Sequence, residues 1–168
     1  ALPRGVRLAD GERLLYDGYG ARLSANHADE LNALAAVITD LTLGGAEAGT
    51  ASAQLSPAFL QRLRLPGVRE AQLSNVNELA FLPEMLPGVE RRRLLGCLVP
   101  AGDVWGTLAR CVNLRELTID RKSGLSGSGI EQLAVLPHLT SLSFTPHPAA
   151  LGELGRLQRL EALRLRVD

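Results

Sequence analysis

The sequence predicts an α/β fold in which short parallel strands, each leading into a short helix, stack in the order of the chain. Two observations support this prediction. Leucine accounts for 34 of the 168 residues, whereas aromatic residues make up only 4%. A leucine pattern also recurs along most of the chain, with successive starts 21 to 30 residues apart. One such segment cannot bury its own apolar side, so the copies must stack and share a core.

The N-terminal segment, residues 1–25, does not follow this pattern. The pair Asp10-Gly11 lies between the apolar runs 6–8 and 14–16, which is a hairpin signal. The first unit of a stack needs a cover over its exposed core. We therefore expect residues 1–25 to form an N-terminal cap, either as a hairpin or as an irregular segment.

Six strand-forming units are predicted within residues 26–168. Their apolar and polar residues alternate, as in Leu117-Thr118-Ile119, which is typical of a half-buried strand. The predicted strands lie near residues 40–43, 70–73, 91–94, 116–119, 141–144 and 162–165.

The first three units are less regular than the last three. The second and third each contain the tetrapeptide Leu-Pro-Gly-Val, at residues 65–68 and 86–89. In the third unit, Arg92 stands where the pattern requires an apolar residue. Either this unit is distorted or its register is shifted.

Helix signals precede several of the predicted strands. Ser56-Pro57 fits an N-cap followed by proline at the first helical position. Ser128 and Glu131 form a capping-box pattern ahead of a helix over residues 130–136. A further apolar helical face comprises Leu31, Leu34, Ala35 and Ile38. An all-helical bundle is the competing interpretation, but the 17 glycines and 9 prolines interrupt the chain too regularly for long helices.

These units resemble leucine-rich repeats over about residues 27–168. The stretches 109–119 and 129–139 are similar to the cysteine-containing subclass found in ribonuclease-inhibitor-like and F-box proteins. The resemblance implies a right-handed solenoid with six parallel strands on its concave side and short helices on its convex side. It also implies a non-catalytic protein-binding module, such as a scaffold or a substrate-recognition arm.

In such a solenoid, the polar residues between the leucines face outward from the concave strands in parallel columns. These columns contain no aromatic residue, so arginine is the best candidate contact, because interface hot spots favour Trp, Tyr and Arg. A mixed polar surface suits a polypeptide better than a small molecule, whose pockets are deep and apolar. The candidate partner-binding residues are Arg91, Arg93, Arg164 and Arg166, with Glu70, Glu116 and Asp120 as their acidic counterparts.

No pattern in the sequence points to catalysis, to a cofactor or to a metal. The serines of the segment 124–129 fit no nucleophile motif, and we expect this segment to be a flexible loop. His27, His138 and His147 lack the spacing of metal ligands. We therefore expect a protein that is not an enzyme.

Charge and cysteine usage narrow the partners and the compartment. Lys+Arg and Asp+Glu are both 18, which argues against nucleic acid as a direct ligand. No run of 18 apolar residues predicts a membrane span. Cys97 and Cys111 show no disulfide or zinc spacing, so we expect an intracellular, cytoplasmic location.

One alternative function is left open by the sequence. The chain could be a structural subunit of a large assembly, ribonucleoproteins included, with the arginine cluster 91–93 near RNA. The absence of an initiator methionine, and an end directly after an apolar run, lead us to expect a piece of a longer chain.

Overall fold

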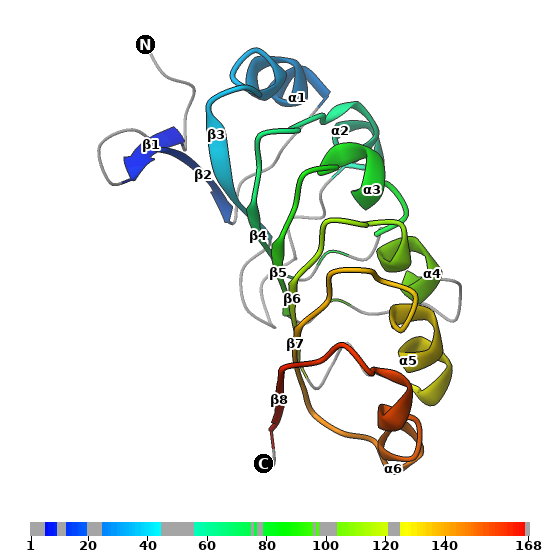
Figure 1. Ribbon diagram of the computed structural model, residues 1–168. Coiled ribbons are helices and arrows are strands. Elements are labelled where there is room, and N and C mark those ends of the chain that lie inside the picture. The colour runs from blue at the N-terminus through cyan, green and yellow to red at the C-terminus, as the bar shows by residue number, and fades with distance from the viewer. Residues whose placement is uncertain are drawn as a thin grey trace.

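The computed structural model of this chain shows one eight-stranded sheet (Figure 1). The strands lie side by side in chain order, from β1 to β8. The structure describes residues 6–9, 13–19, 25–44, 56–74, 76, 79–95, 97, 104–120 and 125–166.

The first two strands form the N-terminal hairpin. β1 (Val6–Ala9) pairs antiparallel with β2 (Arg13–Tyr19), as expected if the N-terminal segment forms a hairpin rather than an irregular segment. The Asp10-Gly11 pair lies outside the described residues. β2 then pairs parallel with β3, so the hairpin continues the sheet rather than standing apart from it.

The other strands are all parallel to their neighbours. The last three coincide with the predicted ranges, and the first three extend beyond them by one to three residues. They are β3 (Ile38–Gly44), β4 (Glu70–Ser74), β5 (Arg91–Leu95), β6 (Glu116–Ile119), β7 (Ser141–Phe144) and β8 (Ala162–Leu165).

Short helices form a second layer, and Figure 1 shows them along the outer side of an arc whose inner side holds the strands. This confirms the prediction of an α/β fold with parallel strands and short helices. The helices are α1 (Ala25–Asn32), α2 (Pro57–Arg62), α3 (Leu82–Met85), α4 (Val104–Ala109), α5 (Gly127–Leu133) and α6 (Pro148–Leu151), with a 3-10 turn, η2, at Leu154–Arg156. None of the described helices is long and apolar enough to cross a membrane.

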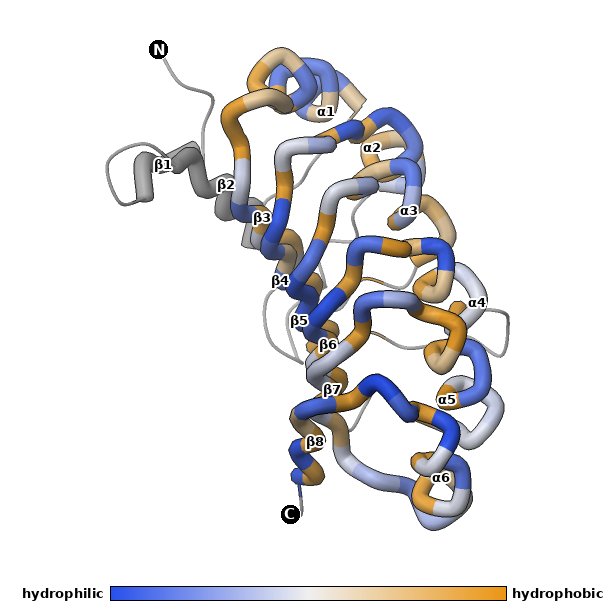
Figure 2. Tube along the Cα trace, viewed as in Figure 1, coloured by the Kyte–Doolittle hydropathy of each residue, from blue (hydrophilic) through white to orange (hydrophobic). Residues whose placement is uncertain are grey.

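The core lies between the two layers and is mostly aliphatic. Hydrophobic and hydrophilic residues alternate along the stacked turns (Figure 2), because successive side chains of a strand point to opposite faces. On strands β3 to β7 the helix-facing residues form two buried columns. The strand register places the members of each column at equal positions on neighbouring strands. One column contains Leu41, Ala71, Arg92, Leu117 and Leu142, and the other contains Leu43, Leu73, Leu94, Ile119 and Phe144.

Arg92 is the one charged member of these buried columns. β5 stays in register with both neighbouring strands, opposite Ala71 on one side and Leu117 on the other, so the third unit is neither distorted nor shifted. The Arg92 side chain is only 1% exposed, and its Nη1 donates to the Sγ of Cys111 at 3.4 Å. Its Nε and Nη2 have no hydrogen-bond partner in the described part of the chain. A buried guanidinium without a carboxylate is costly, because it has lost its water.

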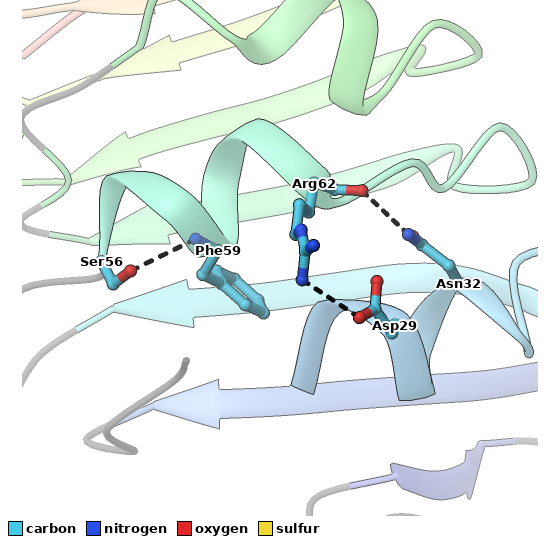
Figure 3. Close-up of polar contacts among 5 residues, drawn as sticks. All are labelled: Asp29, Asn32, Ser56, Phe59 and Arg62. Atoms are coloured by element: carbon cyan, nitrogen blue, oxygen red, sulfur yellow. Dashed lines mark hydrogen bonds and ion pairs between the residues drawn. The ribbon is translucent and has the colours of Figure 1, made fainter. Parts of the chain in front are cut away.

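The N-cap prediction at Ser56 is confirmed. Its extended backbone precedes α2, and its hydroxyl oxygen accepts a hydrogen bond from the Phe59 amide at 3.3 Å (Figure 3). Neighbouring helices are also joined directly. Asn32 Nδ2, at the end of α1, donates to the Arg62 carbonyl at 2.8 Å, and Arg62 pairs with Asp29 at 3.3 Å.

Two other helix predictions are wrong. The cap of α5 is Ser126, whose hydroxyl accepts from the Gly129 amide at 3.2 Å, while Ser128 only contacts the Ser126 hydroxyl. The helix therefore begins at Gly127, inside the segment expected to be a flexible loop. Glycine at position 129 lets the first turn of this helix pack closely, because a Cβ there would lie 2.8 Å from side-chain atoms of Trp105 and of Leu125.

The predicted apolar helical face near residue 35 is also wrong. α1 ends at Asn32, and residues 33–37 form turns. Ile38 is the first residue of β3 rather than part of a helix. The amide of Ile38 still bonds to the Leu34 carbonyl at 3.1 Å, so one helix-like turn remains where periodicity alone indicates a continuing helix.

The repeated Leu-Pro-Gly-Val tetrapeptide has a steric reason. A Cβ on Gly67 would lie 2.8 Å from the Ala35 carbonyl oxygen and 3.0 Å from that of Ile38. A Cβ on Gly88 would lie 2.5 Å from the Pro66 carbonyl oxygen. Each glycine thus lets its turn approach the backbone of the preceding unit.

We expect Gly67→Ala to lower the free energy of unfolding by about 1–3 kcal/mol, because the new methyl group meets fixed backbone oxygens. Urea unfolding followed by circular dichroism measures the change. Gly155→Ala is the matched control, since a Cβ there has nothing within 4 Å. Equal stability of the two variants would contradict the steric explanation.

Arg92→Met should raise the free energy of unfolding by about 1–4 kcal/mol, because an apolar side chain of similar length removes an uncompensated buried charge. The same urea titration applies. Leu117→Met, at the paired position on β6, controls for methionine in this column and should cost less than about 1.5 kcal/mol. A loss of stability in Arg92→Met would show that the charge is compensated.

Candidate functional site

The side of the sheet that faces away from the helices forms an open groove of about 1110 Å³, called here the sheet groove. All six strands from β3 to β8 contribute residues to its lining. Its side chains are mainly carboxylates, guanidiniums, hydroxyls and one amide. Such groups bind a partner through hydrogen bonds and ion pairs rather than by enclosing it in an apolar cavity.

The strand register arranges these side chains in columns that cross the sheet. Residues at equal positions on neighbouring strands are direct partners, as with Arg93 and Thr118 on β5 and β6. The two main columns are Asp40, Glu70, Arg91, Glu116, Ser141 and Ala162, and Thr42, Gln72, Arg93, Thr118, Ser143 and Arg164.

Six of the seven residues predicted to bind a partner line the sheet groove together. They are Arg91, Arg93, Arg164, Arg166, Glu70 and Glu116. Asp120 does not belong to the lining. It follows the last residue of β6 and is partly buried, and its amide donates to the Leu94 carbonyl at 3.1 Å.

One arginine of the groove is paired with a carboxylate, and three others are not. Arg91 forms an ion pair with Glu70 across β4 and β5, and the two side chains are 49% and 45% exposed. Arg93, Arg164 and Arg166 are exposed and form no ion pair with any described residue. The unpaired positive charge of the groove therefore lies on β5, on β8 and at the residue that follows β8.

The acidic side chains lie mostly toward the other end of the groove. On β3 the Asp40 carboxylate accepts a hydrogen bond from the Thr39 hydroxyl at 2.6 Å. Glu70 on β4 is neutralised by Arg91, and Glu116 on β6 is exposed beside the same arginine. The groove thus runs from an acidic end at β3 to a basic end at β8.

Two exposed leucines of the groove were not expected from the sequence. The leucine pattern predicts Leu163 and Leu165 as core residues, but they are 42% and 41% exposed, and both line the groove. These two leucines are exposed because β8 is the last strand of the described sheet and no further described strand stacks on it. A repeat pattern describes each unit but gives no signal for which unit lacks a neighbour.

The described residues contain no group of three or more His, Cys, Asp and Glu side chains that could bind a metal ion. Cys97 and Cys111 are both buried and are not joined in a disulfide. Neither a protein-family model nor a curated protein matches this sequence. Function is therefore inferred from the groove and its charges.

Glu70→Gln should change the free energy of unfolding by less than about 1 kcal/mol, because exposed ion pairs are screened by water and salt. Thermal and urea unfolding at low and at physiological salt measure this. Arg110→Gln, which breaks the exposed pair with Glu84 on the helix side, is the control. A larger loss for Glu70→Gln alone would mean that the groove charges hold the fold together.

Proposed function

We propose that this chain is a leucine-rich-repeat module that binds a segment of another polypeptide in the sheet groove. In this proposal the sheet and helices form a right-handed solenoid, with the strands on its concave side and the hairpin as N-terminal cap. The module holds its partner without transforming it, as a scaffold or a substrate-recognition arm. We propose an intracellular, cytoplasmic location, which is supported by two buried cysteines that form no disulfide.

The observation that carries this proposal is the alignment of polar side chains in register along one open face. Thr42, Gln72, Arg93, Thr118, Ser143 and Arg164 occupy equal positions on six successive strands. Five strand spacings of about 4.8 Å make this column roughly 24 Å long. An extended peptide of about seven residues matches that length.

The groove suits a polypeptide better than a small molecule. Small-molecule sites are enclosed and mostly apolar, whereas this groove is open and presents polar groups along its whole length. A peptide backbone carries a donor and an acceptor at every residue, so it can use hydroxyls such as Thr118 and Ser143 wherever it lies.

The alternative role near RNA has less support. Of the arginines at 91–93, Arg92 is buried in the core and Arg91 is paired with Glu70. Within this cluster only Arg93 is left to contact a phosphate, so the cluster itself has too little positive charge to form a phosphate site.

Selection of a random twelve-residue peptide library against the purified chain tests the proposal. Thr118→Trp places a bulky ring in the middle of the groove. We expect it to weaken the binding of the selected peptides by at least about tenfold, because it blocks the column where they lie. Fluorescence polarisation with labelled peptides measures the affinity.

Val112→Trp is the matched control, because Val112 is 53% exposed and does not line the groove. It should change the affinity by less than about twofold, a difference well below 1 kcal/mol. Circular dichroism establishes that both variants fold. If Thr118→Trp binds every selected peptide as well as the unaltered chain does, the groove is not the binding site and the proposal is wrong.

A further inference from the structure

We propose that the bound segment is acidic and lies across β5 to β8, with one of its carboxylates on Arg93 and a second, four residues along the segment, on Arg164. This inference depends on the proposed function, because it names the chemistry of the partner in the same groove. It rests on the spacing of these two arginines, on their lack of other partners and on the buried charge of Arg92.

The spacing follows from the register. Arg93 pairs in register with Thr118, Thr118 with Ser143, and Ser143 with Arg164. The two arginines are therefore three strand spacings apart, or about 14 Å. An extended chain advances about 3.3–3.6 Å per residue, so four residues cover this distance. Residues four apart on an extended chain also point to the same side, so both carboxylates can face the sheet.

Neither arginine is engaged within the described part of the protein. The side chains of Arg93 and Arg164 are exposed and form no ion pair or hydrogen bond with a described residue, and two neutral hydroxyl groups lie between them. Arg166, two residues beyond Arg164, adds a third uncommitted charge at the same end. A guanidinium binds a carboxylate through two parallel hydrogen bonds, which makes an acidic side chain its best peptide ligand.

The acidic residues of the groove set the position of such a segment. Asp40 and Glu70 make the β3–β4 end unfavourable for another carboxylate. Glu116 lies in the neighbouring column, beside Arg91, and repels a carboxylate from that side. The segment is thereby restricted to the column of Arg93 and Arg164 and to the side on which Arg166 lies.

The buried charge of Arg92 strengthens the attraction for an anion. Its side chain lies beneath the sheet on the same strand as Arg93, and no carboxylate among the described residues pairs with it. A charge surrounded by protein is screened less than one in water, so its field extends to the groove face of β5. An acidic partner then provides part of the counter-charge that the core does not.

A spaced pair of carboxylates fits this groove better than a nucleic acid does. A phosphate backbone carries a charge at every nucleotide, so it would meet Glu116 and Glu70 as well as the arginines. An acidic peptide can place neutral residues opposite these carboxylates. The chain as a whole is also neutral, which removes the long-range attraction that nucleic-acid binding uses.

The test uses the peptides selected from the random library. We expect Asp or Glu pairs four residues apart to be enriched, and binding to weaken as NaCl increases. Arg93→Glu and Arg164→Glu should each reduce the affinity at least about tenfold. The control Arg115→Glu makes the same charge reversal at an exposed residue outside the groove lining and should change the affinity by less than about threefold.

Arg92→Met separates the electrostatic role of Arg92 from a structural one. We expect the variant to be at least as stable as the unaltered chain and to bind the acidic peptides about three- to tenfold more weakly. A structural defect would instead lower stability and affinity together. Unchanged affinity in a folded variant would overturn the role given to Arg92.

The outcomes distinguish this inference from the proposed function. Selected peptides that are neutral or basic, and that lose binding with Thr118→Trp but not with Arg93→Glu, would overturn the acidic partner and leave the groove as a peptide site. Peptides insensitive to Thr118→Trp would overturn both. A twelve-nucleotide single-stranded DNA that binds more tightly than the peptides, through Arg93 and Arg164, would replace the acidic peptide with a polyanion and overturn this inference.

Discussion

Each strand from β3 to β7 buries its apolar side chains because the next strand stacks against it. Leu142 and Phe144 on β7 are fully buried, yet their register partners Leu163 and Leu165 on β8 are 42% and 41% exposed. The two pairs have the same chemistry and the same place in the pattern. The difference is the neighbour, which shows that burial in this protein belongs to the stack rather than to any single unit.

The same period of two that fills the core also creates the groove. A strand that points one residue into the helix layer must point the next one away from it, so the polar columns are in register because the apolar columns are. Thr118, for example, is fixed between Leu117 and Ile119, both of which are buried. The groove side chains can therefore vary in charge without altering the core, provided that the alternation is kept.

Sequence reasoning found strands β3 to β8, their register and the position of six of its seven candidate residues in the groove, because all three follow from one periodic pattern. It failed where the outcome depends on a contact between units. Ser126 and Ser128 both suit an N-cap, but Ser126 accepts the Gly129 amide, and Gly129 lies where a Cβ would meet Trp105. The pairing of the hairpin strand β2 with β3 is another such contact, with no local signal in either segment. Asp120 is a third case, because its amide bonds to the Leu94 carbonyl of the preceding unit at 3.1 Å and its side chain does not line the groove.

Arg92 shows how the core and the groove are linked in spite of their separation. An arginine in a column of leucines lowers the free energy of unfolding, yet β5 keeps its register with both neighbouring strands. That is possible because the long aliphatic part of arginine can fill the space of a leucine while the guanidinium reaches the Cys111 sulfur. The result is a positive charge fixed in place on the middle strand, between the acidic and the basic ends of the groove. Surface side chains can rearrange when a partner binds, but the buried Arg92 charge cannot. Its contribution to the polarity of the groove is therefore fixed by the fold.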